Sequence, residues 1–201
     1  MATRMAAIAC VAVTTVAGPV AAQDDESQAR QLFAEGENAV AEGRLAEAKS
    51  RFEASLRAFP TAAAAYNLAL TTSHMGELLE ARRVIDELLD GHYGPLPADR
   101  RTEVEALRRD IAERLARIRV QVGSEGSSEV FVDGRRVGTG PQVEVEVDPG
   151  GDYVVRVQSG DRTTTEDVRV SAGEIVELEF DLRPIHQPPD PETQHPEPSS
   201  S

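Results

Sequence analysis

Apolar residues in the first half of the chain recur every three or four positions, a spacing that places them on one face of a helix. Leu32, Gly36 and Ala39 share such a face, and Gly43 supplies a turn after it. Pro60 ends the next helix, because proline lacks a backbone donor and clashes with the preceding turn. The apolar face of that second helix consists of Leu45, Ala48, Phe52 and Leu56. The pattern predicts a helical hairpin.

The same hairpin pattern occurs twice. Small residues at the Gly36 and Ala48 positions allow two helix backbones to approach closely. Positions of the first hairpin have counterparts 33 residues later, and the pairs are Gly36 with Ala69, Gly43 with Gly76, Leu45 with Leu78, Ala48 with Ala81, Phe52 with Ile85 and Leu56 with Leu89. This pattern resembles the tetratricopeptide repeat, whose period is about 34 residues. The resemblance covers two units, and it implies a concave groove lined by the first helix of each hairpin.

A further helical pattern covers residues 94–118 and is not a third repeat. At the 33-residue offset Gly76 corresponds to Arg109 and Ala81 to Arg114, so the small packing residues are missing. We interpret the segment as a capping or connecting helix, because a repeat array needs its last apolar face covered. Its arginines alternate with acidic residues, which is typical of a solvated face. The predicted apolar face consists of Val104, Leu107, Ile111, Leu115 and Ile118.

From about Arg119 the apolar pattern changes to the alternation that is typical of strands. Val143, Val145 and Val147 share one face while Glu144 and Glu146 share the other, as in a sheet with one wet side. Turn sequences such as Asp133-Gly134 separate several of the segments. The predicted strands are 119–122, 129–132, 142–147, 152–158, 163–170 and 175–181. These patterns predict a small antiparallel β-sandwich over residues 119–183.

Part of this region resembles a PEGA domain, a β module that recurs in exported bacterial envelope proteins. The likeness is carried by Val130-Phe131-Val132-Asp133-Gly134-Arg135-Arg136-Val137-Gly138, by Asp148-Pro149-Gly150 and by the alternating Tyr153, Val155 and Val157. Ser124-Glu125-Gly126-Ser127 stands where the family has the four residues that name it. The resemblance implies a binding or spacer module without catalytic residues.

Both ends of the chain have compositions that differ from the two predicted domains. Residues 1–22 have the three parts of an export signal: Arg4, an apolar run of 13 residues and a small-residue cleavage site ending at Ala22. That run is shorter than the roughly 20 residues needed to span a bilayer, so we expect cleavage rather than anchoring. A lipoprotein attached through Cys10 is the rival interpretation. Residues 184–201 are polar and proline-rich, which predicts a disordered tail.

Charge and composition narrow the possible functions. The chain has 35 acidic and 21 basic residues, a formal net charge of −14, which disfavours nucleic acid and anionic membranes as partners. Its single cysteine is Cys10, so the mature chain has no thiol chemistry after cleavage. The four histidines are scattered, and no motif predicts a metal site, a cofactor or a catalytic group. We expect a periplasmic or secreted protein that is not an enzyme and has no transmembrane anchor.

The predicted overall organisation is an α+β chain with separate domains, in which helical-hairpin repeats over residues 23–93 precede the β-sandwich. The leading hypothesis is an adaptor that binds a protein or peptide of the cell envelope in the helical groove. The second hypothesis places binding of cell-wall or surface polysaccharide on the β domain. Phe33 and Tyr66 are either groove aromatics or packing residues. The candidate groove residues are Phe33, Glu37, Val40, Tyr66, Asn67, Leu70 and His74.

Overall fold

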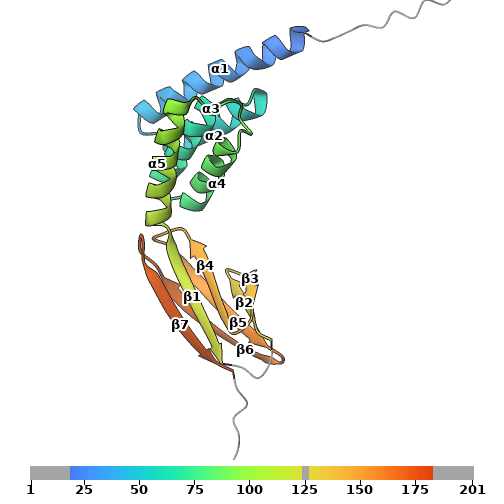
Figure 1. Ribbon diagram of the computed structural model, residues 1–201, viewed down its shortest axis with the longest axis vertical. Coiled ribbons are helices and arrows are strands. Elements are labelled where there is room, and N and C mark those ends of the chain that lie inside the picture. Colours follow the sequence, from blue (N-terminus) through green and yellow to red (C-terminus); the bar gives the residue numbers. More distant parts are fainter. Residues whose placement is uncertain (1–18, 124–126, 183–201) are drawn as a thin grey trace, which may run out of the picture. The chain divides into compact units, whose positions relative to one another are not determined.

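The computed structural model describes residues 19–123 and 127–182, and in this part of the chain five helices precede seven strands (Figure 1). The predicted α+β class, with helices first and strands second, is confirmed. The described residues divide into a helical unit, residues 19–75 and 80–106, and a β unit, residues 76–79 and 107–182. Cys10 and the predicted tail lie outside the described residues, as does most of the predicted signal.

The helices begin and end where the punctuating residues of the sequence lie. Gly43 and Gly76, 33 positions apart, both have positive φ angles, 74° and 82°, which suit glycine after a helix end. Thr61, next to Pro60, caps a helix by accepting a hydrogen bond from the Ala64 amide at 3.2 Å. The helices are α1 (Pro19–Ala41), α2 (Leu45–Ala58), α3 (Ala62–His74), α4 (Leu78–Leu89) and α5 (Ala98–Arg114). The predicted cleavage point after Ala22 lies in the first turn of α1.

Helices α1 and α2 pack closely because one of the facing residues has no side chain. Phe52 of α2 is fully buried, and a methyl group built on Gly36 of α1 would lie 2.6 Å from its Cε1 atom. Ser55 of α2 donates a hydrogen bond to the Ala29 carbonyl of α1 at 2.9 Å. The small residue that the pattern requires at position 36 therefore has a steric cause.

The second hairpin contains the same set of buried positions with different side-chain sizes. Ala69, Ala81 and Ile85, the counterparts of Gly36, Ala48 and Phe52, are all fully buried. The first hairpin thus combines glycine with phenylalanine, and the second combines alanine with isoleucine.

Helix α5 is shorter than the sequence pattern predicts. It ends at Arg114, and strand β1 (Ala116–Gly123) begins two residues later, so the predicted helical boundary at residue 118 is wrong. Ile118 belongs to β1, where it is fully buried with Val120 on the same face. The error arises because Leu115 and Ile118 are three positions apart, a spacing that continues a helical stripe. Ile118 also fits the alternating pattern of β1.

The strands form a three-stranded sheet in the order β4-β1-β7 and a four-stranded sheet in the order β3-β2-β5-β6. Besides β1, the strands are β2 (Glu129–Val132), β3 (Arg135–Thr139), β4 (Gln142–Val147), β5 (Asp152–Ser159), β6 (Arg162–Arg169) and β7 (Ile175–Asp181). Strand β3 is not predicted by the sequence pattern, because Val137 is its only large apolar residue. β1 and β7 pair in parallel, which corrects the expectation of a wholly antiparallel fold. Parallel pairing is possible because a long segment of the chain, which includes β2 to β6, connects β1 to β7.

One hydrophobic core is shared by the two sheets. Buried side chains from β1, β4 and β7 join those from β2 and β5 in a single cluster. Gly138 of β3 lies close to Val143 of β4, since a methyl group built on it would be 2.7 Å from Cγ1 of that valine. Between β2 and β3, Asp133 and Gly134 both have positive φ angles, 50° and 78°, as the hairpin turn predicted from these residues requires.

The opposite face of the β4-β1-β7 sheet carries charged side chains in pairs. Arg119 of β1 forms ion pairs with Glu144 of β4 at 3.0 Å and with Glu177 of β7 at 2.6 Å. Val143 and Val147 are buried in the core while Glu144 is exposed, so the predicted division of β4 into an apolar and a wet face is confirmed.

Candidate functional site

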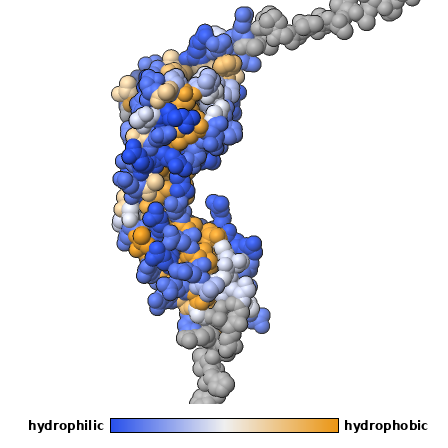
Figure 2. All heavy atoms as spheres, viewed as in Figure 1, coloured by the Kyte–Doolittle hydropathy of each residue, from blue (hydrophilic) through white to orange (hydrophobic). Residues whose placement is uncertain are grey.

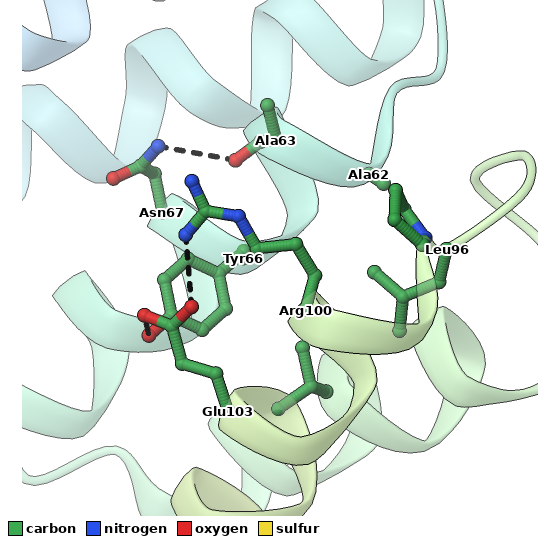
Figure 3. Close-up of a pocket in the computed structure, with 9 residues that line it drawn as sticks. Ala62, Ala63, Tyr66, Asn67, Leu96, Arg100 and Glu103 are labelled. Carbon is green, nitrogen blue, oxygen red and sulfur yellow. Dashed lines mark hydrogen bonds and ion pairs between the residues drawn. The ribbon is translucent and has the colours of Figure 1, made fainter.

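The helical unit has a hollow between α3 and the first half of α5, with a cavity volume of about 440 Å³ (Figure 3). Its lining is mainly apolar, with a few polar groups at defined positions, as is usual for a binding site. Leu96 and Pro97, the two residues that precede α5, close one side of the hollow. The lining residues are Ala62, Ala63, Tyr66, Asn67, Leu96, Pro97, Arg100, Glu103 and Val104.

A chain of hydrogen bonds joins the polar groups of this first hollow. The Tyr66 hydroxyl donates to Oε1 of Glu103 at 2.9 Å, and Nη1 of Arg100 donates to Oε2 of the same carboxylate at 2.8 Å. These donors lower the pKa of Glu103, with the Arg100 hydrogen bond as the largest cause and the Tyr66 hydrogen bond next. Burial, followed by the bond to Glu103, raises the pKa of Tyr66. At neutral pH the hollow therefore holds one carboxylate and one guanidinium that neutralise each other.

Asn67 contributes an amide group to the same hollow (Figure 3). Its Nδ2 atom donates to the Ala63 carbonyl, one turn earlier in α3, at 3.1 Å. The side-chain oxygen has no hydrogen-bond donor among the described residues, so it can accept a bond from the backbone of a bound peptide.

A second hollow, with a cavity volume of about 240 Å³, lies where α1 meets the end of α2 and the start of α3. Phe33 lines it and also packs against Phe52, with ring centroids 5.6 Å apart at 55°. Its charged residues, Glu26 and Arg30 of α1, form an ion pair with each other. The complete lining is Glu26, Ala29, Arg30, Phe33, Ser55, Phe59, Thr61 and Ala63.

Ala63 lines both hollows and is itself exposed. Because its side chain is a single methyl group, the two hollows adjoin across the first turn of α3 without a large residue between them. We call the two hollows together the α1-α3-α5 groove. Hydrophilic residues cover most of the visible molecular surface, and hydrophobic areas are smaller and separate (Figure 2).

The structure distributes the candidate residues of the sequence unevenly over this groove. Tyr66 and Asn67 line the first hollow and Phe33 lines the second, where the aromatic ring both packs and faces the cavity. The remaining four candidates line neither hollow: Glu37, Val40 and His74 are exposed, and Leu70 is half-buried.

The sequence pattern missed the wall that α5 contributes. Arg100 and Glu103 belong to a segment interpreted as a cap with a solvated charged face, so neither was a candidate. A signal was available in the repeat offset: Arg100 and Glu103 lie 33 residues after Asn67 and Leu70, which places them on the equivalent face of the next helix.

The β unit has a more polar hollow of about 540 Å³ at one end of the β4-β1-β7 sheet. Gln121 of β1, Pro141 and Glu179 of β7 are among its lining residues. Phe180 is the one aromatic residue in this described lining, and it is buried. This hollow therefore lacks the exposed ring on which a sugar could stack.

The described residues also bear on metal binding and on membrane spanning. Across residues 19–123 and 127–182, no group of three or more histidine, cysteine, aspartate or glutamate side chains could hold a metal ion. Within the same ranges, no helix has the length and apolar character needed to cross a bilayer.

Comparison with known proteins adds no assignment to this geometry. The sequence matches no protein-family model, and it matches none of the curated proteins.

Proposed function

We propose that this chain is an exported, non-enzymatic adaptor that binds a protein segment of the cell envelope in the α1-α3-α5 groove. In this proposal the helical unit is a short tetratricopeptide-like array, and the β unit is a small PEGA-like sandwich that spaces or holds it. Export rests on the signal-like pattern of residues 1–22. The adaptor role rests on the groove.

The observation that carries the proposal is the pair of adjoining hollows. Four helices, α1, α2, α3 and α5, supply residues to their walls. The described lining combines apolar surface with one phenol, one amide and two ion pairs. Such a surface suits contact with side chains and backbone of a peptide. The lining serine and threonine have no catalytic base beside them among the described residues, since Ser55 bonds the Ala29 carbonyl and Thr61 caps α3, which favours binding over catalysis.

The proposal is tested by filling the groove at Ala63. Replacing this exposed methyl group by arginine places a long side chain at the shared rim of both hollows, and arginine is as compatible with a helix as most residues. Ala46→Arg, at an exposed position of α2 outside both hollows, is the matched control.

Partners are captured from an envelope extract with the wild type and the two variants. We expect one set of proteins to be retained by the wild type and by Ala46→Arg and to be lost with Ala63→Arg. Equal recovery with all three proteins would exclude the groove as the binding surface. Retention of wall or surface polysaccharide by all three would favour the β unit instead.

A further inference from the structure

The charges of the α1-α3-α5 groove are balanced within each hollow. The first hollow contains one acid and one base, Glu103 and Arg100, joined at 2.8 Å. The second contains Glu26 and Arg30, which are also joined to each other. This neutrality is local, because the whole chain has a formal net charge of −14.

Internal pairing decides which side chains the hollows accept. A charged side chain entering either hollow would lose water and meet an opposite charge that already has a partner. An apolar side chain gives up no hydrogen bonds to water on entering, and it covers the methyl groups and rings of the lining. Binding of an uncharged side chain is therefore favoured in both places.

We infer that the occupant of the groove is an uncharged, apolar segment of a partner protein, which crosses α3 and places one apolar side chain on each side of Ala63. This inference rests on the proposed function and adds the chemistry of the partner. The Tyr66–Glu103–Arg100 cluster sets the specificity of the first hollow, because it keeps the guanidinium neutralised. Asn67 accepts a backbone hydrogen bond from the segment.

The cluster can be unbalanced in either direction without changing the shape of the hollow. Glu103→Gln replaces the carboxylate by an amide of similar size and leaves Arg100 without its carboxylate partner. A peptide with an acidic side chain therefore gains a favourable contact. Arg100→Gln leaves Glu103 with only the Tyr66 hydroxyl, so a basic side chain gains instead. Both residues are exposed, so neither change disturbs a core.

A display library of random peptides is selected on the whole chain, and the enriched sequences are synthesised. Each peptide is also made with its enriched apolar residue changed to aspartate or to lysine. Affinities for the wild type, Glu103→Gln and Arg100→Gln are measured by fluorescence anisotropy at low ionic strength. We expect uncharged, apolar peptides to be enriched on the wild type. Glu103→Gln should improve the aspartate peptide, and Arg100→Gln the lysine peptide, by about two- to fivefold, the size of one exposed charge pair.

The outcomes separate this inference from the proposed function. If the wild type enriches charged peptides whose binding is lost with Ala63→Arg, the groove binds peptides and only the inferred chemistry is wrong. Unchanged preferences in both glutamine variants would also overturn the inference. If no peptide binds, or if Ala63→Arg binds as well as the wild type, the proposed function and the inference both fail.

Discussion

In the helical unit Gly36 lies against the ring of Phe52, whereas in the β unit Gly138 lies against the side chain of Val143. The first contact brings two helices together around one large, fully buried ring. The second joins β3 to β4 beside a core that many valines from both sheets already fill. A single residue therefore carries more of the packing in the helical unit than in the β unit.

The two units also differ in their surfaces. The helical unit leaves two apolar hollows open along α1, α3 and α5. The outer face of the β4-β1-β7 sheet instead carries ion pairs such as those of Arg119. Our proposal that recognition lies in the helical unit rests on this contrast, and changes in the two units should have separable effects.

The largest expected effect is that of Phe52→Ala. Removing a fully buried ring leaves a cavity between α1 and α2, which should lower the free energy of unfolding of the helical unit by about 3–5 kcal/mol. Urea denaturation followed by the far-ultraviolet helix signal measures this loss. Phe59→Ala is the matched control, because Phe59 is 39% exposed and its removal leaves no buried cavity. Equal losses for the two variants would show that the Phe52 ring has no special packing role.

Gly36→Ala should have the next largest effect, about 1–3 kcal/mol of destabilisation, because its new methyl group would lie 2.6 Å from Phe52 Cε1. The loss should shrink when the same change is made together with Phe52→Ile, which reproduces the alanine and isoleucine of the second hairpin. A double-mutant cycle in urea measures the coupling. Additive effects would contradict the steric explanation.

Gly138→Ala tests the corresponding contact of the β unit. Its methyl group would lie 2.7 Å from Val143 Cγ1, yet Gly138 is only half-buried and the neighbouring chain can shift. We expect about 1 kcal/mol of destabilisation, the lower end for an overpacked site. Hydrogen exchange of the strand amides measures it, and protection of the α1 and α2 amides should stay unchanged. A loss as large as that of Gly36→Ala would remove the contrast between the units.

Arg119→Gln should have the smallest effect on stability. The ion pairs of Arg119 with Glu144 and Glu177 are solvated, and such pairs contribute little and are screened by salt. We expect a small shift in the urea midpoint at low ionic strength that disappears at high ionic strength. A large, salt-independent loss would show that this face contributes to the core of the β unit.

Much of this fold could be predicted from the sequence because its signals are local. The 33-residue offset and the turn glycines Gly43 and Gly76 locate the hairpins, and alternation along β4 assigns its two faces. Strand β3 and the parallel pairing of β1 with β7 could not be predicted in this way. Both depend on contacts between distant segments, and β3 has too few apolar residues for a periodic signal.

The candidate site could be predicted only in part, for a similar reason. Tyr66, Asn67 and Phe33 follow from the face that a helical hairpin presents. Arg100 and Glu103 join the groove through the position of α5 against α3, and the 33-residue offset signals it only weakly because the small packing residues of a repeat are missing from α5. The arginines and acidic residues that alternate along α5 instead predict an ordinary solvated face, so neither residue was a candidate.

Site-specific photo-crosslinking tests the central claim most directly, which is that the partner binds across the first turn of α3. A benzoylphenylalanine is introduced at Ala63 or, as the comparison, at the exposed Thr165 of β6, and cells that produce each chain are irradiated. The account predicts a discrete crosslinked partner from position 63 and none from position 165. A partner captured from position 165 alone would contradict it and would place recognition on the β unit.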